Sequence, residues 1–173
     1  MQIKEFGTLQ DKQHWLMKIR EADWRAATYL YALLSEDTFY NQYGGDKAKV
    51  FLLTEGDELI SFCTYAEKDD ISESGLIPWI GFVYTFPQFR GKRRIGKLIE
   101  HSYRLAKAEG RTSLYLSTDQ KGLYEKFGFT YIATMKNRWG EDALVYQLNI
   151  EHKDYSGIIG KSVKGNKPCG ICW

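Results

Sequence analysis

The sequence predicts an α+β fold, in which a mixed, mostly antiparallel central sheet is flanked by helices. Three observations carry this prediction. Segments with strand composition outnumber segments with helical periodicity, and two pairs of neighbouring strands are separated only by short turns. A single long amphipathic segment connects two further strands, which indicates one crossover and not a repeating βαβ pattern.

The chain before residue 76 is expected to hold two helices and a β-hairpin. The expected elements are a short strand (3–9), a helix (11–22), a second helix capped by Asp23, an aromatic loop (39–45) and the two strands of the hairpin (50–54 and 59–65). The aromatic loop, FYNQYGG, either closes over a substrate or is a plain connection. The acidic segment at 67–75, EKDDISESG, is expected to be solvated surface.

The stretch from residue 78 to 110, PWIGFVYTFPQFRGKRRIGKLIEHSYRLAKAEG, organises the chain. Its apolar run at 79–86 predicts a buried strand, which Pro87 ends because proline cannot donate to a sheet ladder. A turn rich in Gly, Lys and Arg then leads into a helix that Gly110 ends with a left-handed cap. Backbone amides and the positive end of a helix converge at such a turn, so we expect it to bind an anion, most often a phosphate.

The remaining elements complete one expected domain. They are a strand at 112–117, a short helix at 120–127 closed by Gly128, and two strands at 129–134 and 143–150 joined around 137–140. Residues 1–150 are expected to form a single domain, because a chain of 173 residues suits one core and no linker or repeat interrupts it. The Lys- and Gly-rich residues 151–173 are expected to be a C-terminal extension or tail.

Composition and charge exclude several classes of function. Hydrophobic residues make up 43% and aromatic residues 15% of the chain, which indicates a folded protein. The net charge of +2 is too small for wholesale nucleic-acid binding, so we expect no nucleic-acid partner and a local anion at the basic turn. The polar start MQIKEFGTLQ does not resemble a signal peptide and no apolar run approaches about 18 residues, so we expect no membrane partner and a cytoplasmic location.

One interpretation of the basic turn is a P-loop for nucleotide phosphates. Residues 91–97, GKRRIGK, fit the pattern G-x-x-x-x-G-K, but the next position should be Ser or Thr, whose hydroxyl binds Mg²⁺. Leu98 stands there and cannot ligate a metal. The chain also has too few parallel βα units for a doubly wound nucleotide-binding fold, so this interpretation is the weaker one.

The stronger interpretation depends on a second motif, GLYEKFGF at 122–129, which follows the next expected strand. With this motif in place, the chain resembles the GNAT superfamily of acetyl-CoA-dependent N-acetyltransferases. One block of the resemblance is the strand, the sequence PQFRGK at 87–92 and the helix beyond it, and the other block is LYEKFGF. The order and separation of the blocks match the family over residues 79–150, and the preceding hairpin and helix pair fit a GNAT-like layout.

The resemblance implies where acetyl-CoA, the acyl donor, binds. The pantetheine arm would enter a gap between the strands at 79–86 and 112–117 and pair with backbone groups near Val83 and Thr85. The family's phosphate turn is R-G-x-G-x-G or similar; here the middle glycine is missing and one residue is added, while two arginines can neutralise a pyrophosphate or 3′-phosphate. The expected cofactor-binding residues are Val83, Tyr84, Thr85, Arg90, Gly91, Lys92, Arg93, Arg94, Ile95, Gly96 and Lys97.

The resemblance also implies a catalytic residue, Tyr124, which matches the family's tyrosine placed to protonate the departing CoA thiolate. A phenol has a pKa of about 10, keeps its proton at neutral pH and can therefore donate it. The expected reaction is direct attack of a primary amine on the bound thioester. The base that takes the amine's proton stays open between bulk water and the carboxylates of Glu36, Asp37, Glu67, Asp69, Asp70 and Glu73.

The sequence leaves several properties open. The acceptor can be a small amine, an antibiotic, a peptide N-terminus or a protein lysine, and the protein can be a monomer or a homodimer. An acyl-CoA-binding protein without turnover is an alternative to the enzyme. Cys169 and Cys172 form a lone C-x-x-C, which without a second pair of ligands predicts no zinc site, and we expect no metal in the reaction. Cys63 is expected to be buried in a strand.

Overall fold

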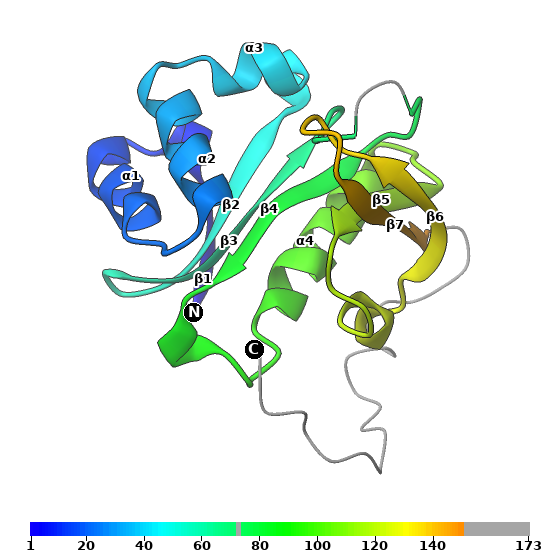
Figure 1. The fold of residues 1–173 in the computed structure, drawn as a ribbon. Helices are drawn as coiled ribbons and strands as arrows, with labels where there is room; N and C mark the ends of the chain where they lie inside the picture. Colours follow the sequence, from blue (N-terminus) through cyan, green and yellow to red (C-terminus); the bar gives the residue numbers. More distant parts are fainter. Residues whose placement is uncertain (72–73, 151–173) are drawn as a thin grey trace.

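The computed structural model describes residues 1–71 and 74–150, which form an open seven-stranded sheet with helices on both faces (Figure 1). The strand order is β1-β2-β3-β4-β5-β7-β6, and every neighbouring pair is antiparallel except β4 and β5. The predicted α+β class with a mixed, mostly antiparallel sheet is therefore confirmed. Glu73 and the predicted C-terminal extension, with Cys169 and Cys172, lie outside the described residues.

The elements follow the predicted order along the chain. The strands are β1 (Gln2–Glu5), β2 (Lys49–Glu55), β3 (Glu58–Ala66), β4 (Trp79–Thr85), β5 (Ser113–Thr118), β6 (Thr130–Lys136) and β7 (Asp142–Asn149). The α-helices are α1 (Lys12–Arg20), α2 (Arg25–Ser35), α3 (Phe39–Tyr43) and α4 (Ile95–Ala108). The short 3₁₀ helices are η1 (Phe6–Thr8), η2 (Gly45–Lys47), η3 (Pro87–Phe89) and η4 (Tyr124–Phe127). Within the part of the chain that the structure describes, no helix has the length and apolar character needed to cross a bilayer.

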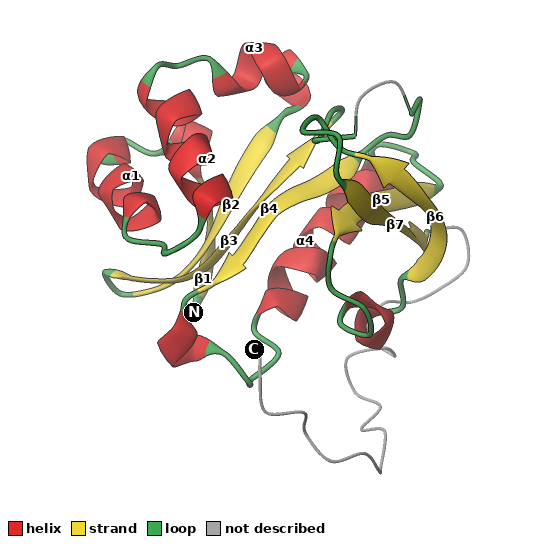
Figure 2. Ribbon diagram, viewed as in Figure 1, coloured by secondary structure: helices red, strands yellow, loops and turns green. Residues whose placement is uncertain are grey.

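Alternate residues of the central strands pack on opposite faces of the sheet. Val50 and Leu52 of β2 join the core beneath α1 and α2, whereas Phe51 and Leu53 join the core beneath α4. A strand covered on both faces has no solvent-facing positions, which explains why β2 is apolar along most of its length. Figure 2 shows this arrangement, with α1 and α2 on one side of the sheet and α4 on the other.

The sheet opens between β4 and β5. Their ladder has a single position, Trp79 opposite Tyr115, and beyond it the strands diverge toward the carboxyl end of β4 (Figure 2). Helix α4 provides the crossover between these two parallel strands. The divergence expected between them is thus present, and beyond Trp79 no strand among the described residues pairs with this edge of β4.

Three local predictions for the first 45 residues are wrong. The first strand ends at Glu5, and the chain continues as a 3₁₀ helix. Asp23 does not cap α2, because the N-cap residue is Trp24, whose side chain makes no capping hydrogen bond. The segment predicted as an aromatic loop forms α3, since Phe39 and Tyr43 lie one turn apart, are both buried and stack with their ring centroids 4.9 Å apart.

Helix α4 ends, as predicted, at a glycine cap. Gly110 has a φ of +72°, its amide donates to the carbonyl of Lys107, and the amide of Arg111 donates to that of Ala106 at 2.9 Å. A Cβ at Gly110 would meet no atom within 4 Å, so only the backbone conformation disfavours a side chain. We expect Gly110→Ala to lower the free energy of unfolding in urea by about 1–2 kcal/mol, and Gly110→Asn by less. An alanine variant as stable as the wild type would contradict the role of the cap.

Candidate active site

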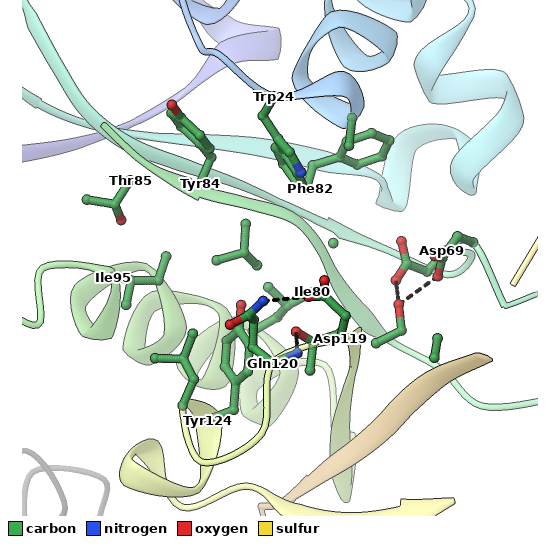
Figure 3. A pocket seen from close by; sticks show the side chains of 18 of the residues that line it. Trp24, Asp69, Ile80, Phe82, Tyr84, Thr85, Ile95, Asp119, Gln120 and Tyr124 are labelled. Carbon is green, nitrogen blue, oxygen red and sulfur yellow. Dashed lines mark hydrogen bonds between the residues drawn. The ribbon is translucent and has the colours of Figure 1, made fainter. Parts of the chain in front are cut away.

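A cleft of about 1110 Å³ occupies the opening beside β4. It brings together segments that are far apart in the sequence, and its lining residues fall within 23–29, 80–95, 117–127 and 137–143, with contributions from Tyr43, Asp69 and Asp70. Figure 3 shows Tyr124 across the cleft from Trp24 and Tyr84, with Ile95 toward one end and Asp69 toward the other. The cleft therefore has two ends of different chemistry, which are described in turn.

The basic turn forms one end, directly before α4. Gly91 has a φ of +80° and Arg93 one of +50°, a left-handed conformation that is uncommon outside glycine. The amides of Gly96 and Lys97 donate the first bonds of the helix, to the carbonyls of Arg93 and Arg94, so the amides before them are free of the helical ladder. No acidic residue lies in the first turn of α4, and the positive end of the helix is therefore not neutralised.

The three arginines of the turn have different surroundings. Arg90 donates from Nε to the carbonyl of Thr85 at 2.9 Å, and Arg93 donates from Nη2 to the carbonyl of Lys126 at 2.9 Å. Arg94 lines the cleft, and its Nη1 is buried without a hydrogen-bond partner among the described residues. Because an unpartnered buried donor of a charged group is costly, this nitrogen indicates where an anion would bind.

Most of the predicted cofactor-binding residues line the cleft: Val83, Tyr84, Thr85, Arg90, Gly91, Arg93, Arg94 and Ile95. Lys92, Gly96 and Lys97 do not. Gly96 is buried, and a Cβ there would lie 3.0 Å from the ring of Phe127, so this glycine allows α4 to approach η4 closely. Lys97 instead lines a separate groove together with His101 and Arg104, because the helical period turns it away from the cleft.

A bulge interrupts β4 where it passes the cleft. Two of its residues, Phe82 and Val83, face the single residue Cys63 of β3. Phe82 has a φ of +47°, which is strained for an aromatic residue, and such strain is often found at functional sites. A bulge leaves one residue outside the β3–β4 ladder. Here that residue belongs to β4, and the opposite edge of β4 borders the cleft.

Tyr124 begins η4, which is shorter than the helix predicted for residues 120–127. As predicted, Gly128 closes the segment, with a φ of +88°, and the amide of Phe129 donates to the carbonyl of Tyr124 at 3.2 Å. This compact turn holds the tyrosine ring edge-on against Phe129, with the ring centroids 6.0 Å apart. The side chain is therefore fixed in the wall of the cleft.

The phenol of Tyr124 is a protonated hydroxyl in a buried position. The residue is 6% exposed and lines the cleft, and its hydroxyl has no hydrogen-bond partner within the described part of the chain. Burial is the main cause that raises the pKa of this phenol well above its ordinary value, and the nearby Cys63 and Asp119 raise it further. The group can donate a proton at neutral pH but cannot act as a base there.

Asp69, toward the other end of the cleft, comes from the segment predicted to be solvated surface, and that prediction is wrong for it. Its carboxylate lies against β4, where a Cβ on Gly81 would come within 2.6 Å of Oδ1. The Ser117 hydroxyl lies 3.1 Å from Oδ2 of Asp69 and 2.6 Å from Oδ1 of Asp70. The two carboxylates therefore share a single hydroxyl donor. Burial and the charge of Asp70 raise the pKa of Asp69 to about 8.

The other candidate carboxylates are less suited to act as a base. Glu67 is bound by Lys47 at 2.9 Å and by Arg111 at 3.2 Å, and these cations hold the pKa of its carboxyl below the ordinary value. Glu36 and Asp37 are exposed and do not line the cleft. Asp70 does line it, beside Asp69.

Aromatic residues from three elements gather in this part of the cleft, and sequence reasoning did not identify this group. Tyr29 of α2 and Tyr43 of α3 both contact Phe82 of β4, with ring centroids 6.3 and 5.8 Å apart. Arg138, from the turn between β6 and β7, reaches both tyrosines. The aromatic character of the segment at 39–45 was the one sequence signal that pointed here.

Comparisons with known proteins agree with this architecture. The model of the Acetyltransferase (GNAT) family matches residues 16–129. Similar solved structures include an acetyltransferase from Streptococcus agalactiae 2603, with 19% identity and a TM-score of 0.60 over 86% of this chain and 97% of that one. Two others share 12% identity over 88% of this chain and 99% of theirs: the aminoglycoside 6′-N-acetyltransferase from Enterococcus faecium, with a TM-score of 0.62, and an aminoglycoside 6′-N-acetyltransferase complexed with coenzyme A, with 0.60. A search of curated proteins gives no match. Because the model of this family matches most of the described residues, the chain belongs to the GNAT family of acetyltransferases.

Proposed function

We propose that this protein transfers the acetyl group of acetyl-CoA to a primary amine by direct attack of the amine on the thioester. The observation that carries the proposal is the cleft, which has a basic turn at one end, a carboxylate toward the other and a protonated phenol in the wall between them. These are the groups needed to hold a coenzyme, activate an amine and protonate a leaving thiolate. Membership of the GNAT family supports acetyl-CoA as the donor of the acetyl group.

The coenzyme is proposed to lie along β4 with its phosphates at the basic turn. The free amides before α4 and the buried Nη1 of Arg94 provide donors for phosphate oxygens. The arm would run along the edge of β4 that no strand covers. Because Arg90 already donates to the carbonyl of Thr85, Val83 is the better placed of the two predicted backbone partners.

The proposed reaction uses Asp69 as base and Tyr124 as acid. An ammonium group loses a proton to Asp69, and the free amine then adds to the thioester carbonyl carbon. As the C–N bond forms and the C–S bond breaks, Tyr124 gives its proton to the thiolate. The nitrogen loses a second proton, which restores the phenol, and the proton on Asp69 passes to solvent. The products are an N-acetyl amide, CoA thiol and one proton.

Coenzyme binding is tested by thermal unfolding. We expect saturating acetyl-CoA to raise the melting temperature by several degrees, because a ligand that binds only the native state stabilises it by mass action. ATP with Mg²⁺ should have much less effect, since the position that would ligate the metal in a P-loop is Leu98, which is fully buried. Strong stabilisation by ATP with none by acetyl-CoA would favour the P-loop interpretation instead.

The role of the turn is tested with Arg94→Ala. We expect this change to raise the dissociation constant of CoA about 10-fold or more, because a charge-assisted bond to phosphate is lost. The loss should be larger at low salt, where screening is weak. Lys107→Ala removes one positive charge from the far end of α4 and serves as the control. Equal effects of the two variants in calorimetric titrations would show that Arg94 contributes only long-range charge.

A further inference from the structure

Arg138 is a charged residue of the cleft that the proposed reaction does not use. Its Nη1 donates to the hydroxyl of Tyr29 at 3.0 Å, its Nη2 donates to that of Tyr43 at 3.1 Å, and Nη2 lies 3.5 Å from the backbone carbonyl oxygen of Asp69. All of these partners are uncharged. Among the described residues, no carboxylate lies within salt-bridge distance of this guanidinium.

The other charges on this turn and beside it are already paired. Glu141 lies 3.9 Å from Arg25, and Asp142 lies 2.8 Å from Lys136. The Asp69 and Asp70 carboxylates meet the Ser117 hydroxyl and not a cation. Within the described part of this half of the cleft, Arg138 is therefore the cation whose charge is not balanced by a direct carboxylate contact.

The turn that carries Arg138 is well ordered by its own hydrogen bonds. Oδ1 of Asn137 accepts from the amides of Trp139 at 3.0 Å and Glu141 at 2.9 Å, and the amide of Asn137 donates to the Glu141 carbonyl at 2.9 Å. The guanidinium carbon also lies 5.5 and 5.7 Å from two tyrosine ring centroids. A guanidinium held in this way presents a fixed positive charge, and its Nε hydrogen and second Nη1 hydrogen, which no described residue accepts, are available to a carboxylate.

We propose that the acceptor is a free amino acid or a similar small amine that carries a carboxylate close to its amino group, with Arg138 binding the carboxylate and Asp69 facing the amine. The two charged groups belong to the same half of the cleft, and Arg138 approaches the main chain of Asp69 itself. A molecule that carries an ammonium and a carboxylate group close together is complementary to this pair of charges. The inference rests on the proposed N-acetyltransferase activity and adds the class of acceptor.

The class of acceptor is tested with matched sets of amines. Glycine, alanine, leucine and phenylalanine are each compared with the corresponding amide and the decarboxylated amine, and spermidine is added as a polycation. Release of CoA thiol is measured at several pH values, and kcat/KM is expressed per total amine, because the proposed reaction begins with the ammonium form. We expect at least one amino acid to exceed both of its relatives about 10- to 100-fold, the usual effect of one hydrogen-bonded charge. A preference for amides, decarboxylated amines or spermidine would overturn the inference and leave the proposed function standing. If none of the amines in the set supported release of CoA thiol, both the inference and the proposed function would be overturned.

The role of Arg138 itself is tested with the best amino acid and its amide. At a pH above the Asp69 limb of both proteins, we expect Arg138→Gln to raise KM for the amino acid about 10- to 100-fold with little change in kcat, and to leave KM for the amide nearly unchanged. Arg138→Lys should recover part of the loss, because it keeps the charge but not the planar fork. Lys136→Gln, which removes a charge from the outer part of the same hairpin, is the control. Equal effects of Arg138→Gln on amino acid and amide, or higher activity toward both, would show that Arg138 shapes or closes the pocket without recognising a carboxylate.

Discussion

Tyr124→Phe is expected to lower kcat at least about 100-fold while acetyl-CoA binds with nearly unchanged affinity. The variant keeps the ring that packs against Phe129 and removes only the hydroxyl, which has no partner among the described residues. General acid catalysis contributes about 10²- to 10⁴-fold to a rate, so its loss should appear in kcat and kcat/KM together. Steady-state kinetics and calorimetric titration with acetyl-CoA measure the two quantities separately.

The matched control for this variant is Tyr131→Phe. Tyr131 lies on β6 and is 49% exposed, and among the described residues its hydroxyl bonds Thr134 alone, so the loss of this hydroxyl should leave turnover unchanged. A Tyr124→Phe enzyme with normal turnover would show that Tyr124 is a packing residue and that solvent protonates the thiolate. If the wild type binds acetyl-CoA but turns over no amine, the protein is an acyl-CoA-binding protein without catalysis.

Asp69→Asn is expected to lower kcat/KM by about 10²- to 10⁴-fold, because the amide cannot take a proton from the ammonium group. The variant should fold. Burial disfavours the charge of Asp69, so its raised pKa lowers the stability of the native state progressively as the pH rises from the ordinary Asp range to about 8, and the loss is complete above that pH. Asp69→Asn should therefore be at least as stable as the wild type above pH 8 in urea titrations, and a loss of activity there would reflect chemistry.

The pH dependence of kcat/KM gives a sharper test of Asp69. A base must be deprotonated to act, so the activity of the wild type should rise as the pH rises through about 8, and Asp69→Asn should lose this limb. Asp70→Asn should move the limb to lower pH, because the neighbouring charge that helps to raise the pKa is gone. Arg138→Gln should move it to higher pH, because the cation lowers the pKa.

The other groups that face Asp69 do not titrate near pH 8 and would not give the same shifts of the pH limb. The Ser117 hydroxyl of β5 favours the ionised carboxylate and does not titrate. Tyr43 of α3 and Tyr124 of η4 both have a pKa raised far above neutral pH, chiefly by burial, so neither changes its charge near pH 8. A limb that stays in place in both Asp69→Asn and Asp70→Asn would therefore belong to the free amine, and water would be the base.

The coenzyme half of the site could be predicted because its signals are local in sequence. The apolar run that forms β4, the proline after it, the Gly-rich basic turn and the periodic helix follow one another within residues 78–110. Backbone conformation there depends mainly on near neighbours, as the positive φ angles at Gly91 and Gly110 illustrate. The resemblance to the GNAT superfamily, carried in part by the motif at 122–129, then implied that Tyr124 lies in the same site.

The acceptor half could not be predicted, because its side chains meet only through tertiary structure. Asp69 looks like its neighbours in an acidic run, and it is half-buried, with its carboxylate against Gly81 of β4 and Ser117 of β5. Arg138 lies in a plain hairpin turn, and its two tyrosine partners are 109 and 95 residues away. Periodicity contains no information about such long-range contacts.

The central claim, direct acetyl transfer from acetyl-CoA to an amine in this cleft, is tested most directly with acetyl-CoA carrying a ¹³C label in its acetyl group. The protein is incubated with the labelled donor and the amine that supports the fastest thiol release, and both small molecules and intact protein are analysed by mass spectrometry. The account predicts a ¹³C-labelled N-acetyl amine formed in a one-to-one ratio with CoA thiol, while the protein stays unlabelled. Thiol release without an acetylated amine, or an acetyl group on the protein that chases into product, would contradict it.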